Sequence, residues 1–285
     1  MPTSAVRVVT DSTAHLPAEL GAAARLRVVP LTVIVSGEAG LEGIDITPDD
    51  VARALRERRH TVTTSRPAPA EFAEVYREVL ADGASGIVSV HLSARLSGTY
   101  ESALLAAEEF DGRVRVVDSM AAGSGVGFVA LAANEVAEAG GDLEEVRLAA
   151  LAAAERIATF FYVDTLEFMR RGGRISVASA LVGTALAVKP ILHVVRGEVV
   201  LKERVRTSAR ALARLAELVV EAAEGGDVDI AVQHLAAADR AQSLRDELRR
   251  RLGDRVGVAL LSEVGAAIAA HTGPGVIGVA VHRRR

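Results

Sequence analysis

Short runs of β-branched residues alternate with helical stretches through the first half of the chain, and this alternation limits the possible folds more than any other feature. The segments Val6–Thr10, Gly86–Val90 and Val114–Val117 predict strands, and helices are expected from Pro69 to about Leu80 and over Gly98–Phe110. Strands that alternate with helices form βαβ units, in which the strands run parallel. The pattern therefore predicts an α/β fold with a mostly parallel sheet.

The second half of the chain shows a different order of expected helices and strands. It predicts a helix of small residues at Val177–Ala187 and a hairpin around Arg196-Gly197, then helices and strands in mixed order, while Val28–Val35 in the first half predicts one further strand. A length of 285 residues is enough for about two domains. We therefore predict an N-terminal, mostly parallel α/β domain at 1–158 and a C-terminal mixed α/β domain at 159–285.

Composition excludes several classes of function. The chain has no cysteine, so disulfides, catalytic thiols, thiolate zinc sites and iron–sulfur clusters are ruled out. A formal net charge of −4 and an aromatic content of 3%, with no Trp, argue against a nucleic-acid partner. The longest apolar stretch is interrupted by Pro30, and the N-terminus does not resemble a signal peptide. We therefore expect a cytoplasmic protein without stable membrane insertion.

Motifs for metals and nucleotides are also missing. The seven histidines show neither the H-E-x-x-H pattern nor another paired spacing. The glycines of Gly123–Gly127 follow G-x-G-x-G rather than the dinucleotide spacing G-x-G-x-x-G, and neither lysine lies in a Walker A sequence. The sequence therefore predicts no metal and no cofactor.

Hydroxyl-rich segments follow several of the expected strands, which is where open α/β sheets bind ligands. Ser12 and Ser93 lie in two of these segments, and Ser97 is placed to cap the helix that begins near Gly98. A glycine there lets a ligand approach backbone N–H groups, which attract an anion. An ordinary turn or helix cap explains each segment equally well at this stage.

Four further residues are candidates for a site. Thr64 lies in a hydroxyl-rich loop closed by two prolines, which fix the backbone, and a helix lead-in is the simpler interpretation. His271 is expected in a turn before the last strand, where it either serves an anion or is a solvated turn residue. Arg174 and Arg206 belong to small basic clusters, which are usually solvated surface but can dock an anionic partner.

One series of motifs spans nearly the whole chain: Asp11-Ser12-Thr13, Thr64-Ser65-x-Pro67, Leu96-Ser97-Gly98-Thr99-Tyr100, Val117-Asp118-Ser119, Val163-Asp164-Thr165-Leu166-Glu167, Gly172-Gly173-Arg174-Ile175, Lys189-Pro190-Ile191-Leu192 and His271-x-Gly273-Pro274-Gly275. Taken in order along the chain, these motifs resemble the DegV family, the fatty-acid-binding subunits of bacterial fatty acid kinase. Arg66 departs from the pattern, because it stands where glutamine is common in the family.

The resemblance implies a two-domain DegV-like fold that binds one long-chain fatty acid. Thr64, Ser97, Gly98 and neighbouring backbone N–H groups would hold the carboxylate, with His271 close by. The N-terminal domain would carry the carboxylate-binding loops, and the C-terminal domain would contribute the apolar tunnel for the tail and the His271 turn. Ser12, Ser93 and Ser119 would belong to a possible additional loop of the site.

The resemblance also implies a partner. The chain would be no enzyme itself but would present the bound acid to a separate ATP-binding kinase subunit, which docks at Arg174 and Arg206 and makes the acyl phosphate. Two alternatives stay open from the sequence. One is a stand-alone α/β enzyme that acts on a small carboxylated or phosphorylated ligand with His271 as acid or base, and the other is a regulatory module without lipid.

Overall fold

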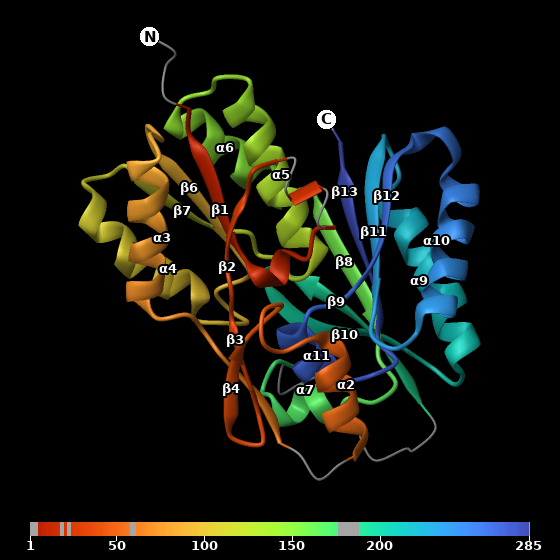
Figure 1. Ribbon diagram of the computed structural model, residues 1–285. Helices are drawn as coiled ribbons and strands as arrows, with labels where there is room; N and C mark the ends of the chain where they lie inside the picture. The colour runs from red at the N-terminus through yellow and green to blue at the C-terminus, as the bar shows by residue number, and fades with distance from the viewer. Residues whose placement is uncertain (1–4, 18–19, 22–23, 58–60, 176–187, 285) are drawn as a thin grey trace.

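The computed structural model describes most of the 285 residues, in the ranges 5–17, 20–21, 24–57, 61–175 and 188–284. Three sheets organise these residues (Figure 1). A four-stranded sheet and a six-stranded sheet lie side by side, and a three-stranded sheet lies in the lower part of the view. The α/β class, with a parallel sheet from the first half of the chain, is confirmed.

The four-stranded sheet is parallel throughout and has the order β2-β1-β6-β7. Its strands are β1 (Arg7–Asp11), β2 (Arg27–Val29), β6 (Ile87–His91) and β7 (Val114–Asp118). Both faces are covered by helices, which is why every residue of β6 and all but the first residue of β1 are buried. The helices are α5 (Ser124–Glu138) and α6 (Leu143–Ala154) on one face, and α3 (Pro69–Ala81) and α4 (Thr99–Ala107) on the other.

The six-stranded sheet is mixed and has the order β10-β9-β8-β13-β11-β12, with one parallel pair, β11 and β12. Helices α9 (Ser208–Ala222) and α10 (Ala238–Leu252) cover one face. On the other face Phe128 of α5 packs against Ala231 and Ala280, so α5 is shared by the two large sheets. The strands are β8 (Ile157–Tyr162), β9 (Lys189–Val195), β10 (Glu198–Val205), β11 (Val228–His234), β12 (Val256–Glu263) and β13 (Ile277–Arg283).

The three-stranded sheet is antiparallel and comes from the first half of the chain. Its strands are β3 (Thr32–Val35), β4 (Glu38–Leu41) and β5 (Val62–Ser65), in the order β4-β3-β5. This sheet and α2 (Pro48–Glu57) share one apolar core with α7 (Glu167–Arg171) and α11 (Ala266–Thr272). Residues from the first half therefore complete a core of the second half, and the division of the chain at residue 158 stays a prediction.

Two expectations from the sequence are wrong, and one lies outside the described residues. Val28–Val35 is not one strand: Pro30 has no N–H for a sheet ladder, and the chain passes there from β2 in one sheet to β3 in another. His271 lies in the last turn of α11 rather than in a loop. The helix expected at Val177–Ala187 lies outside the described residues.

The hairpin expected around Arg196-Gly197 is confirmed. Val195 pairs with Glu198, and the two residues between them have φ values of 49° and 80°. Positive φ at both central residues is what a two-residue hairpin turn requires.

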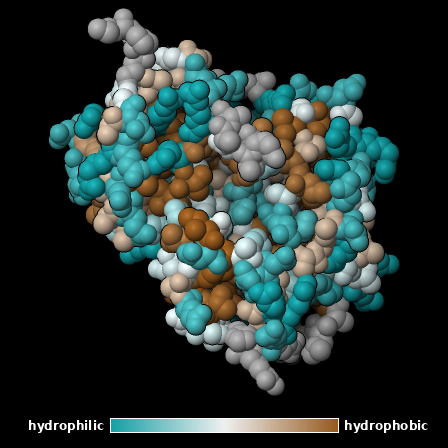
Figure 2. Space-filling view, in the orientation of Figure 1, coloured by the Kyte–Doolittle hydropathy of each residue, from teal (hydrophilic) through white to brown (hydrophobic). Residues whose placement is uncertain are grey.

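On the face shown in Figure 2, hydrophobic residues form several separate patches, and hydrophilic residues cover most of the surface around them. Among the residues that the structure describes, none of the helices combines the length and the apolar character needed to cross a bilayer.

Candidate functional site

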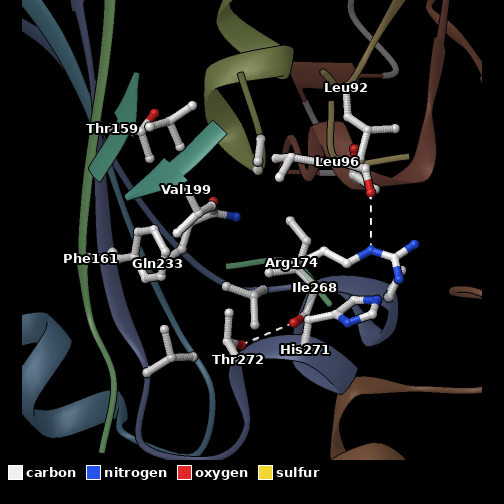
Figure 3. Close-up of a pocket in the computed structure, with 18 of the residues that line it drawn as sticks. Leu92, Leu96, Thr159, Phe161, Arg174, Val199, Gln233, Ile268, His271 and Thr272 are labelled. Carbon is white, nitrogen blue, oxygen red and sulfur yellow. Dashed lines mark hydrogen bonds between the residues drawn. The ribbon is translucent and has the colours of Figure 1, made fainter. Parts of the chain in front are cut away.

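A cavity lies where the two large sheets meet α11 (Figure 3). Its volume is about 120 Å³. Most of the wall is apolar, and the polar side chains in it are Thr13, Thr64, Ser97, Thr159, Arg174, Gln233, His271 and Thr272.

The sheet side of the cavity is shaped by small residues. Phe161 of β8 and Gln233 of β11 flank Gly278 of β13 in one row, and Thr159 lies beside Ala280 in the next. Residues directly opposite one another in antiparallel strands point to the same face, so both rows face the cavity. Gly278 and Ala280 leave the space above the sheet open.

One side of the cavity carries a group of polar and charged side chains. Thr64 Oγ1 lies 2.9 Å from His271 Nε2, which joins β5 to α11. Arg174 donates from Nε to the carbonyl oxygen of Leu96 at 3.1 Å, next to Ser97. Figure 3 shows Arg174 and His271 on the side of the cavity opposite to Phe161. Segments far apart in the sequence therefore build one polar end.

His271 is a neutral side chain in this setting. Burial of the imidazole and the nearby Arg174 guanidinium lower its pKa to about 4. A neutral imidazole has one donor and one acceptor nitrogen. Nε2 faces Thr64, and Nδ1 is buried without a hydrogen-bond partner among the described residues. The positive charge at this end of the cavity therefore comes from Arg174.

The structure brings together three of the four residues expected at the carboxylate: Thr64, Ser97 and His271 all line the cavity. Gly98 lies just outside it, as the residue before the first turn of α4. A Cβ atom at Gly98 would collide with the guanidinium of Arg66, so the two positions are packed together.

The other three serines do not line the cavity. The Ser12 hydroxyl donates to Glu42 and accepts the N–H of Leu31 at 2.9 Å. The Ser93 hydroxyl donates to the carbonyl oxygen of Gly197 at 2.8 Å. Ser119 accepts the N–H of Ala121 at 3.2 Å. Their hydroxyls make the local contacts of turn residues, and Ser93 also holds the β9–β10 hairpin against the parallel sheet.

The two arginines assigned to docking lie in different surroundings. Arg174 is half-buried in the cavity wall, where it also donates to the carbonyl oxygen of Gly172. Arg206 is exposed just after β10. The contact of either residue with a kinase stays a prediction, and the position of Arg174 favours a contact with the bound ligand.

A chain of buried hydrogen bonds supports the loops above the cavity. Tyr76 donates to Ser89 at 2.8 Å, Ser89 lies 2.7 Å from His91 Nε2, and His91 Nδ1 lies 3.0 Å from Asp11. Asp11 also accepts the N–H of Leu92 and the hydroxyl of Thr13, both of which belong to cavity-lining residues. Every polar group named in this network has a hydrogen-bond partner, so the network holds these loops in place.

Sequence reasoning missed several cavity residues. Thr159 lies in β8 and Gln233 in β11, and no motif marks either residue. Thr13 stands in the Asp11-Ser12-Thr13 motif, which pointed to this loop through its neighbour Ser12. In the described ranges no three His, Asp or Glu side chains gather as they would around a metal ion.

Comparisons with known proteins agree with this architecture. The model of the family described as "Uncharacterised protein, DegV family" matches residues 5–284. The chain is 51% identical over 279 residues to the DegV domain-containing protein SCO2569 of Streptomyces coelicolor, covering 98% of this chain and 99% of that protein.

Two solved structures are also similar. The fatty-acid-binding DegV family protein from Thermus thermophilus has a TM-score of 0.92 and 40% identity, covering 98% of this chain and 100% of that one. DegV of Bacillus subtilis, named as a fatty acid binding protein, has a TM-score of 0.89 and 32% identity, covering 99% and 100%. Because the family match and these identities extend over almost the full length, the chain belongs to the DegV family.

Proposed function

We propose that this chain binds one long-chain fatty acid, with the carboxylate at the Thr64, Ser97, Arg174 and His271 end of the cavity and the tail along its apolar walls. The observation that carries the proposal is a largely apolar cavity with an arginine, a histidine and two hydroxyls on one side. The similar DegV proteins of Thermus thermophilus and Bacillus subtilis are named for binding fatty acids, which supports it.

The energetics of such a ligand suit this arrangement. A C16 tail of ~15 methylene-type groups contributes a gross ~12 kcal/mol at ~0.8 kcal/mol for each buried group. A buried carboxylate without partners costs several kcal/mol, so the head group needs donors. Arg174 supplies charge, and Thr64 and Ser97 supply hydroxyl donors.

We assign the proton of the neutral imidazole to Nε2 of His271. In this tautomer Nε2–H donates to Thr64 Oγ1, and the Thr64 hydroxyl proton remains for the carboxylate. The buried Nδ1 then carries no hydrogen that lacks an acceptor. His271 thus orients Thr64, and Thr64 contacts the ligand.

We further propose that the bound acid is presented, in the cytoplasm, to a separate ATP-dependent kinase subunit. A carboxylate oxygen attacks the γ-phosphorus of ATP, the bond from that phosphorus to the bridging oxygen of ADP breaks, and acyl phosphate and ADP result. The chain supplies the positioned substrate. Arg206 is exposed and suits contact with an acidic or phosphate-bearing partner surface, because arginine binds such groups in bidentate fashion.

Mass spectrometry of the purified protein tests the first proposal. We expect a mass increment equal to a fatty acid, and binding of added palmitate or oleate after the protein is stripped of lipid. A protein that carries no lipid and binds neither acid refutes it.

Acyl-phosphate formation with a fatty acid kinase subunit and ATP tests the second proposal. Arg206→Ala should keep the bound fatty acid and lose product, whereas the exposed Arg249→Ala on α10 serves as the control and should keep both. Normal product formation by Arg206→Ala would remove this residue from the docking surface.

A further inference from the structure

A buried carboxylate connects three segments beside the cavity. Glu42 follows β4, and its side chain is only 2% exposed. Oε1 accepts the N–H of Ala267 at 2.9 Å and lies 3.4 Å from His15 Nε2, and Oε2 accepts the Ser12 hydroxyl. An ionised carboxylate only accepts hydrogen bonds, so these donors compensate for its burial.

The Glu42 side chain caps the N-terminus of α11. Ala267 is the second residue of this helix, and Gly265 before it has no side chain that could cap the free N–H groups. A Cβ atom at Gly265 would collide with both the His15 imidazole and the Glu42 carboxylate. The glycine therefore gives these two side chains access to the start of α11.

The same carboxylate also holds the loop after β1. Ser12, which donates to Glu42, accepts the N–H of Leu31 at 2.9 Å. Leu31 and the Thr13 that follows Ser12 both line the cavity, as does Ala267 at the other end of the arrangement. One carboxylate thus joins cavity-lining segments that are distant in the sequence.

We infer that Glu42 is a positioning residue for the polar end of the cavity, because it fixes α11 and thereby holds His271 within hydrogen-bond distance of Thr64. Helix α11 has only seven residues, and helices this short depend on caps and tertiary contacts for their stability. His271 lies in its last turn, about one helical turn beyond Ala267. The ligand in this inference rests on the proposed fatty-acid function, but the placement of His271 does not.

The first test reads the position of His271 in protein without ligand. Glu42→Gln keeps the size of the side chain but turns one acceptor oxygen into a donor NH₂ group, so it can no longer accept from both the Ala267 N–H and the Ser12 hydroxyl. The pKa of His271, measured by NMR titration of its ring signals, should rise from about 4 toward the ordinary 6.5 as the imidazole loses its buried place. Glu203→Gln is the matched control, because Glu203 binds Arg214 on the α9 face and should leave this pKa unchanged.

The second test is a double-mutant cycle on palmitate affinity. Glu42→Gln should raise the Kd by about tenfold in the wild-type background, and by less than about twofold when His271→Ala is already present. A general loss of stability would weaken binding in both backgrounds. If Glu42→Gln does not fold, Ser12→Ala removes one donor to the carboxylate and should change the two readouts in the same direction.

The outcomes separate this inference from the proposed function. An unchanged His271 pKa in folded Glu42→Gln, or an equal rise in Kd in both backgrounds, refutes the positioning role. A raised His271 pKa in a protein that binds no fatty acid in any form supports the positioning role and refutes the proposed ligand.

Discussion

Replacing Thr64 by valine removes one hydroxyl from the cavity while keeping a β-branched side chain of similar shape. Thr64 Oγ1 lies 2.9 Å from His271 Nε2, so the change deletes the hydroxyl that, under the proposed function, the imidazole orients toward the carboxylate. A hydrogen bond to a charged group contributes about 1.5–3 kcal/mol, which corresponds to about a 10- to 150-fold rise in Kd. We expect a loss in this range for palmitate.

Calorimetric titration of lipid-stripped protein with palmitate and with hexadecanol measures the effect. The matched control is Thr63→Val: Thr63 is the preceding residue of β5, exposed, and neighbouring residues of a strand point to opposite faces. Thr64→Val should weaken binding of the acid much more than binding of the alcohol, and Thr63→Val should change neither. Equal Kd values for the two variants, or an equal loss for acid and alcohol, would refute the assignment of Thr64 to the carboxylate.

Three further predictions follow from the cavity. Arg174→Met keeps an unbranched stem but removes the charge, so the palmitate Kd should rise by at least about tenfold while hexadecanol binding stays constant; an unchanged palmitate Kd contradicts this. Because the pKa of His271 is about 4 in the folded protein and 6.5 is its ordinary value, the unfolded chain takes up this proton first as the pH falls. The neutral imidazole of His271 therefore stabilises the folded protein fully above about pH 6.5, and this contribution of up to roughly 3 kcal/mol is lost as the pH falls toward about 4. The free energy of unfolding of His271→Asn, measured in urea, should lack this part of the pH dependence. Ala280→Leu fills space above the sheet, so mass spectrometry should find shorter bound acyl chains than in the wild type, and an unchanged chain-length distribution contradicts the placement of the tail.

Much of the fold could be predicted because its signals are local. The β-branched runs of β1, β6 and β7 and the helices between them repeat at the spacing of βαβ units, and parallel strands follow from that connection. The hairpin at Arg196-Gly197 depends on two adjacent residues. β8 and α11 could not be predicted in this way. The aromatic run of β8 and the alanine-rich run of α11 each fit more than one kind of element.

The candidate site could be predicted only in part. Thr64, Ser97 and His271 stood in motifs, and the resemblance to the DegV family connected them. The resemblance predicts a docking role for Arg174, and nothing in Gly172-Gly173-Arg174 shows that its guanidinium reaches the carbonyl oxygen of Leu96. A hydrogen bond between residues 78 positions apart depends on how the chain folds back, and no local pattern carries that information.

The sequence by itself determined the elements with strong local signals and the chemistry available. The spacing of hydrophobic residues and the proline at position 30 act through local backbone geometry, and the absence of cysteine is a matter of composition. Only the tertiary structure decided that β3, β5 and α2, from the first half of the chain, complete the core around α11, and that Glu42 caps this helix. The physical reason is that burial and hydrogen-bond satisfaction are properties of the packed chain. A glutamate 225 positions before Ala267 becomes its partner only when both are removed from water together.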